Sequence, residues 1–209
     1  MDPRRALVLR RNTQIILQQR ENNEGRFADM TTCILFFRGI NVGGRNVLPM
    51  HELVSMLDNL GFPGALTYIQ SGNVALRCTR QQMANLGRRI SEAVQQRLGF
   101  EPWVLVSRIQ ELEHAIAANP FREGAKEPKS LHLWFLAREP VEPDLEALER
   151  VKAGSEHFKL DRKVFYLHAP EGIGRSRLAQ RVEKSLGVDA TSRNWRTVTK
   201  VLEMAWQLS

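Results

Sequence analysis

The chain contains few cysteines and no long apolar run, and both absences restrict what it can be. Only two of its 209 residues are cysteine, so neither a CxxC metal pair nor a disulfide framework can form. No apolar stretch approaches the roughly 20 residues that a membrane-spanning helix needs. We therefore expect a cytoplasmic protein without a membrane segment. Its two cysteines, Cys33 and Cys78, lie in apolar strand patterns, where buried reduced thiols are expected.

The signatures of known hydrolytic sites are also missing. The sequence has no GxSxG elbow, no HExxH helix and no Cys–His arrangement. Its five histidines are scattered, and none has the spacing of a metal-ligand set. We expect no metal and no cofactor, and the sequence names no catalytic residue.

The net charge of +7 is mild, because it is spread over 30 basic and 23 acidic residues. It permits an acidic partner such as RNA without requiring one. Residues 1–29 contain six arginines but no secretory apolar core. We interpret this segment as an N-terminal extension that is disordered or reflects a mis-assigned start, with Met30 as the functional start.

From residue 30 onward, the apolar periodicity predicts two runs of strand, helix, strand, strand, helix and strand. The first run comprises strands at 32–37, 65–70, 74–78 and 103–107, with helices at 48–61 and 81–99. The second comprises strands at 131–136, 157–160, 164–168 and 188–191, with helices at 143–154, 176–187 and 194–208. This order is that of the split β-α-β unit.

The predicted fold is therefore an α+β (α/β sandwich) protein of two tandem ferredoxin-like modules with a C-terminal helix. Residues 121–130, FREGAKEPKS, are polar and rich in helix breakers, which favours a domain boundary there. We expect a first module with a connecting helix over residues 30–122, and a second over residues 123–209. The open faces of the two sheets could pack against each other.

The loop at 38–46, RGINVGGRN, is the first candidate site. It superficially resembles a nucleotide-binding P-loop, but Arg45 and Asn46 replace the lysine and the magnesium-binding hydroxyl of that motif. Its glycines can adopt positive φ and direct amide groups at an anion, while its arginines can grip phosphate or carboxylate. The alternative is that the glycines only form a tight loop and the arginines are solvated.

Topology should bring a second polar loop to the same place. In the split β-α-β unit the first two strands are parallel, so the loop at 38–46 and the hairpin at 70–73 should be neighbours. The hairpin composition is also ordinary turn chemistry. The candidate anion-binding residues of this edge are Arg38, Gly39, Asn41, Gly43, Gly44, Arg45, Gln70, Ser71, Gly72 and Asn73.

Two stretches of the second module could also bind an anion. In the first, Gly174, Arg175 and Ser176 precede a predicted helix, where amides, a guanidinium and a hydroxyl coincide. In the second, Arg193 and Asn194 stand at the start of the last helix, where basic residues oppose the helix dipole unless an anion compensates. A glycine turn with a serine cap is the structural alternative for the first stretch.

The strings FFRGINVGGRN, TYIQSGNV, NPF, LHLWFL, FYLHAPEGIGRS and TSRNWRTVTK occur in this order. Together they closely resemble the bacterial family known as domain of unknown function 1697, from Thr32 to about Trp206. The resemblance implies a compact cytoplasmic α/β protein with ferredoxin-like modules. It brings no established activity, but it points to the same loops.

The leading hypothesis is a protein that binds an anionic, phosphate-bearing ligand such as a nucleotide, a phosphorylated metabolite or RNA. An enzyme acting on a phosphorylated small molecule, with Asn73 or Asn194 positioning it, is the second hypothesis. A protein-interaction scaffold with purely structural loops is the third. The sequence predicts no oligomeric state.

Overall fold

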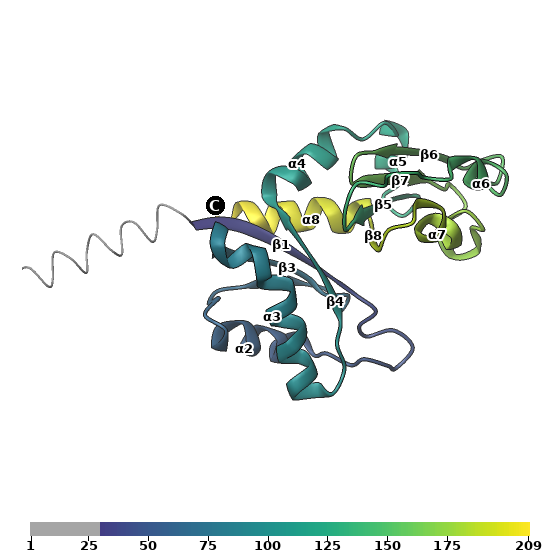
Figure 1. The fold of residues 1–209 in the computed structure, drawn as a ribbon. Helices are drawn as coiled ribbons and strands as arrows, with labels where there is room; N and C mark the ends of the chain where they lie inside the picture. The colour runs from purple at the N-terminus through teal and green to yellow at the C-terminus, as the bar shows by residue number, and fades with distance from the viewer. Residues whose placement is uncertain (1–29) are drawn as a thin grey trace, which may run out of the picture.

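The structure is a computed structural model that describes residues 30–209, so the expectation for residues 1–29 lies outside it. These residues contain seven α-helices and two four-stranded antiparallel sheets (Figure 1). The mixed α+β class predicted from the sequence is confirmed.

The first sheet has the strand order β2-β3-β1-β4, and two helices cover one of its faces. The elements are β1 (Met30–Arg38), α2 (Met50–Asn59), β2 (Leu66–Tyr68), β3 (Asn73–Thr79), α3 (Arg80–Leu98) and β4 (Trp103–Arg108). The ends of α3 follow from its sequence. Thr79 and Gln82 form a reciprocal capping box at its start, and Gly99 adopts the left-handed conformation just past its end.

The second sheet repeats this order as β6-β7-β5-β8. Its elements are β5 (Leu131–Leu136), α6 (Leu145–Glu149), β6 (His157–Asp161), β7 (Val164–His168), α7 (Val182–Leu186) and β8 (Ala190–Asn194). The connections α4 (Ile109–Ala117) and α5 (Arg122–Lys126) join the two halves, and α8 (Trp195–Trp206) ends the chain.

The helices of the second half are shorter than predicted. Only Val182–Leu186 of the predicted helix at 176–187 is α-helical, and two 3₁₀ turns, Ile173–Arg175 and Ala179–Arg181, precede it. Ser176 is extended and bonds only locally, because its Oγ accepts from the amide of Ala179 at 2.9 Å. Its side chain therefore caps a turn, and the apolar spacing around Leu178 serves packing without a continuous helix.

The two halves pack through the sheet faces that α2, α3, α6 and α7 leave open. Phe36 of β1 stacks on Phe135 of β5 with ring centroids 4.8 Å apart. The helix that follows each half crosses to the other, so α8 lies along β1 and β3 while α4 reaches the second sheet (Figure 1). There the hydroxyl of Tyr166 donates to the carbonyl of Ala115 at 2.9 Å. One shared core thus joins both halves.

The expectation of two reduced thiols is wrong, because Cys33 and Cys78 form a disulfide. They lie on the adjacent strands β1 and β3, where Cys33 pairs with Leu76 and Cys78 with Thr31. Both side chains face the core under α2 and α3. The Cα atoms are 6.6 Å apart, a separation that a disulfide can span.

Candidate anion-binding site

The tip of the loop at 38–46 is a tight turn. The amide of Arg45 donates to the carbonyl of Val42 at 3.0 Å, and the residues between them, Gly43 and Gly44, have φ of 58° and 72°. Two consecutive positive φ angles are typical of a type I′ turn, which glycine adopts at the least steric cost. The tip and the Arg45 side chain are exposed, so anion binding by Gly43, Gly44 and Arg45 stays a prediction.

The loop and the hairpin are neighbours, as the topology predicted. The side-chain amide of Asn41 donates to the carbonyls of Gln70 at 2.7 Å and Leu48 at 2.9 Å. The amide of Phe37 donates to the carbonyl of Gly72 at 2.9 Å. Asn41 therefore ties the two loops together and is not free to bind a ligand.

Arg193 is the most buried charged group of this region, with 9% of its surface exposed. From β8 it reaches the first half, where Nε donates to Oδ1 of Asn73 at 2.5 Å and Nη2 donates to the carbonyl of Phe37 at 2.6 Å. Its guanidinium also lies over the ring of Phe36, 5.2 Å from the centroid. No carboxylate within residues 30–209 forms an ion pair with it.

Burial lowers the pKa of Arg193 to about 10, because the surrounding protein solvates its charge less well than water does. Arg193 is therefore still a cation at neutral pH, and carbonyl, amide and hydroxyl oxygens stabilise it in place of a carboxylate. Asn73 is fully buried and also donates to the carbonyl of Tyr68 at 3.0 Å. These contacts hold β8 against the hairpin of the first half.

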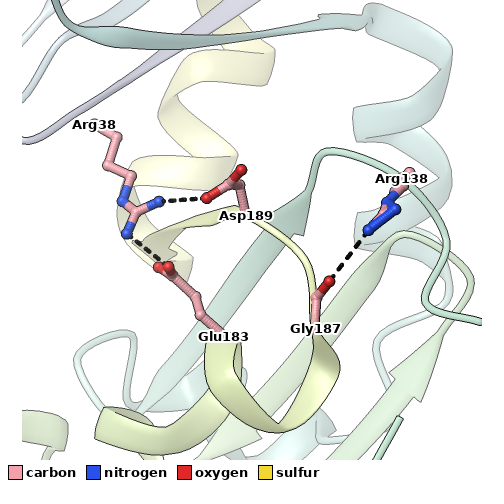
Figure 2. Close-up of polar contacts among 5 residues, drawn as sticks. All are labelled: Arg38, Arg138, Glu183, Gly187 and Asp189. Atoms are coloured by element: carbon pink, nitrogen blue, oxygen red, sulfur yellow. Dashed lines mark hydrogen bonds and ion pairs between the residues drawn. The ribbon is translucent and has the colours of Figure 1, made fainter. Parts of the chain in front are cut away.

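Arg38 carries the second cation of the region, and it pairs across the two halves. Figure 2 shows its guanidinium between Glu183 of α7, at 2.6 Å, and Asp189, at 3.2 Å. Partial burial raises the pKa of Glu183, the charge of Asp189 adds to this, and the charge of Arg38 opposes both. Arg138 donates to the carbonyl of Gly187 at 3.3 Å and so holds the turn between α7 and β8 (Figure 2).

A cavity of about 280 Å³ lies between these two cations. The predicted residues on its wall are Arg38, Gly39, Ser71 and Arg193. The second half contributes Trp134, Glu183 and Thr191, which the sequence did not single out. No local pattern marks these three as site residues, because only the packing of the two halves brings them to the loop.

The other predicted residues lie outside this cavity. Asn73 touches it only through Arg193, and Asn194 caps α8 by accepting from the amide of Thr197 at 2.9 Å. The remaining members belong to the loop tip, the hairpin or the first 3₁₀ turn, and none is on the wall: Asn41, Gly43, Gly44, Arg45, Gln70, Gly72, Gly174, Arg175 and Ser176. Within residues 30–209, no three His, Cys, Asp or Glu side chains could hold a metal ion together.

Comparison with known proteins identifies the family of the chain. The family described as protein of unknown function (DUF1697) matches residues 30–166, well over half of the chain. The chain belongs to this family. The match confirms the resemblance noted in the sequence and includes the loop at 38–46 and the hairpin, whereas Arg193 lies beyond it.

A conserved bacterial protein from Streptococcus pneumoniae, SP0830, has a similar structure with a TM-score of 0.60. It is 20% identical, and the similarity covers 84% of this DUF1697 chain and 99% of the other, which supports the fold alone. No curated protein matches the chain. In the part that the structure describes, no helix has the length and apolar character needed to cross a membrane.

Proposed function

We propose that this DUF1697 protein binds a small anion, a phosphate or carboxylate group, in the cavity between Arg38 and Arg193. The observation that supports it best is the guanidinium of Arg193, a cation that is 9% exposed and has no carboxylate partner among the described residues. A buried cation is costly unless oxygen atoms or an anion compensate it. An anion in the cavity would add a negative charge beside this guanidinium, whose N–H groups already donate to Asn73, Thr191 and main-chain carbonyls.

Arg38 would supply the second contact. Its side chain is about two-fifths exposed, and its present partners are Glu183 on the cavity wall and Asp189 outside it. A ligand oxyanion would compete with Glu183 for this guanidinium, and the raised pKa of Glu183 makes that carboxylate the easier one to neutralise. The volume of about 280 Å³ suits the charged group of a metabolite or one phosphate of a nucleotide or RNA.

A thermal-shift screen of the full chain against inorganic phosphate, nucleotides, sugar phosphates and short RNA tests the proposal. A ligand at about 100 times its Kd adds roughly 2.7 kcal/mol of stability, or on the order of 5–10 °C in Tm for a chain of this size. Salt dependence separates the sources, because binding of an RNA backbone weakens steeply with salt.

Arg38→Ala should weaken binding by at least tenfold while changing stability by about 1 kcal/mol or less, because its ion pairs are exposed. The matched control is Arg45→Ala, which removes the same charge from the loop tip. The sequence alone predicts that Arg45 binds as well, so a loss of binding in that variant would favour the loop over the cavity. Unchanged binding in Arg38→Ala would contradict the proposal.

Each half is also proposed to be a ferredoxin-like module, with the boundary at residues 122–123. Support comes from the antiparallel order β4-β1-β3-β2 with two helices on one face, which the second half repeats. A cytoplasmic location stays a prediction. A flat response in the screen would indicate the scaffold hypothesis. Turnover of a ligand found by the screen, measured separately, would indicate the enzyme hypothesis.

A further inference from the structure

The two halves of the chain are structurally equivalent, residue by residue, around the stacked rings of Phe36 and Phe135. In the first sheet Phe36 pairs with Asn73 of β3 and Leu105 of β4. In the second sheet Phe135 pairs with Val164 of β7 and Thr191 of β8. The amide of the next residue confirms the register, because Phe37 donates to Gly72 and Leu136 donates to Lys163, both at 2.9 Å.

This equivalence assigns a counterpart to Arg193. Arg193 stands two residues after Thr191 on β8, and Ser107 stands two residues after Leu105 on β4. Arg193 fills the space beside Phe36 and bonds to the neighbouring carbonyls and to Asn73. At the equivalent place beside Phe135, the chain has only the small side chain of Ser107.

A cavity of about 660 Å³ lies at that place, more than twice the volume of the cavity beside Arg193. Its wall contains Ser107, the counterpart of Arg193. It also contains the counterparts of the groups around Arg193: Leu105, Phe135, Leu136, Lys163 and Val164. The repeated architecture therefore creates this space, and no side chain of the described residues occupies it as Arg193 does in the other half. Its size is that of a site for a small organic molecule.

The wall combines an apolar floor with an excess of cations. Leu105, Phe135 and Val164 supply apolar surface. Four basic residues line the cavity, and none of them pairs with a carboxylate of residues 30–209: Arg80, Arg108, Arg162 and Lys163.

The carboxylates of the wall do not balance these four charges. There are three, Glu111, Glu139 and Asp161. Glu111 is already used within the fold, because its Oε2 accepts from Oγ of Ser107 and from the amide of Arg108, both at 2.8 Å. Asp161 lies 4.0 Å from Nε2 of His114. An anionic group brought by a ligand would be stabilised by the basic side chains that remain unpaired.

We propose that the cavity at Ser107 and Phe135 binds an organic anion of about mononucleotide size. Its ring or apolar body lies against Leu105, Phe135 and Val164, and its phosphate or carboxylate meets Arg108 and Lys163. This site is separate from the small-anion site at Arg38, because the two cavities share no wall residue.

The fluorescent anion 8-anilinonaphthalene-1-sulfonate is a suitable probe for the folded full chain. We expect saturable binding of one probe per chain, displaced by adenosine monophosphate if the site takes phosphates and by 4-phenylbutyrate if it takes carboxylates. Displacement by either competitor supports the proposal. Failure of the probe to saturate at one per chain, or of both competitors to displace it, would overturn the proposal.

Two variants locate the binding. Ser107→Arg places in this half the side chain that fills the other, and should abolish probe binding. Because Ser107 is buried and this substitution can impair folding, Arg108→Ala/Lys163→Ala removes two exposed cations instead and should weaken binding by at least tenfold. Arg77→Ala/Lys159→Ala, which removes the same charge from exposed strand positions off the wall, should bind the probe as the wild type does.

Arg38→Ala separates the two proposals. It should leave probe binding unchanged, whereas the Arg108/Lys163 variant should leave binding at the small-anion site unchanged. Retained probe binding in a folded Ser107→Arg protein, or in the Arg108/Lys163 variant, would place the probe elsewhere and overturn the assignment. Loss of probe binding in Arg38→Ala would do the same.

Discussion

At the scale of single residues, the deepest polar groups hold the fold together through hydrogen bonds to oxygen atoms instead of ion pairs. Arg193 is satisfied by Asn73, by main-chain carbonyls and by the hydroxyl of Thr191 at 2.8 Å. The main effect of these hydrogen bonds is to avoid a penalty, because a buried donor or acceptor without a partner costs about 1–3 kcal/mol. Arg193 is therefore both a structural link and, in our proposal, the wall of a site.

His132 on β5 is half-buried, with a buried Nδ1, and it should make stability depend on pH. Burial lowers its pKa to about 4, and Nδ1 has no hydrogen-bond partner among the described residues. The unfolded chain binds a proton near pH 6.5 and the folded chain only near pH 4, so stability should fall as pH drops through this window. The expected loss is up to about 3 kcal/mol, at about 1.4 kcal/mol for each unit of pKa.

Urea unfolding of the wild type and His132→Gln at pH 7 and pH 4 measures this loss. The difference in unfolding free energy between the two pH values should be smaller in the variant. The same substitution at the exposed His51 controls for the removal of a histidine. An identical pH response of the wild type and His132→Gln would show that another group is responsible.

At the scale of elements, the hairpin between β2 and β3 is fixed by a close backbone approach at Gly72. A Cβ atom there would lie 2.5 Å from Cβ of Phe37 and 2.6 Å from Cδ1 of Ile40, and φ is 68°. This contact is what lets Phe37 pair with the hairpin and places Ser71 on the cavity wall. The strand pattern alone indicated a turn here, but not that the turn presses against β1.

Gly72→Ala should lower the free energy of unfolding by about 3 kcal/mol, because it adds a steric clash to an unfavourable φ. Gly43→Ala is the matched control. Its φ is also positive, at 58°, but nothing lies within 4 Å of the added Cβ, so a cost of about 1 kcal/mol is expected. Equal losses in the two variants, measured by chemical denaturation, would contradict the role assigned to the close contact.

At the scale of the whole molecule, the two halves share one core that neither could complete alone. Ile34 and Phe36 of the first sheet, Leu133 and Phe135 of the second, and the inner faces of α4 and α8 belong to the same buried cluster. α8 follows the second half and packs on β1, β2 and β3 of the first, whereas α4 follows the first half and reaches the second through the hydrogen bond from Tyr166 to Ala115 (Figure 1). Because removing either half would expose this cluster, the halves should unfold together.

Hydrogen exchange under native conditions should therefore give the same opening free energy for the protected amides of β1 and β5. Phe36→Ala removes the ring stacked on Phe135 and should lower that shared value by about 3–5 kcal/mol. A lower opening free energy for one half alone in the wild type would contradict a single cooperative unit.

The sequence by itself determined the family, the order of strands and helices, the repeat of that order, and the meeting of the loop at 38–46 with the hairpin. These features depend on local periodicity, on glycine and proline positions, and on the handed topology of a split β-α-β unit, all of which are encoded along the chain. The sequence predicted longer helices in the second half than the structure contains, because the apolar spacing at Leu178 fits a packed 3₁₀ turn as well as a helix.

Only the tertiary structure decided which of those residues share a site. It paired Arg38 with Glu183 and Asp189, buried Arg193 against Asn73, joined Cys33 to Cys78, and left the space at Ser107. Except for the cysteine pair, these features depend on how one half packs against the other. The residues involved are far apart in the sequence, so local sequence patterns cannot predict their contacts. The disulfide depends on strand register, which likewise emerges only when β1 and β3 are aligned.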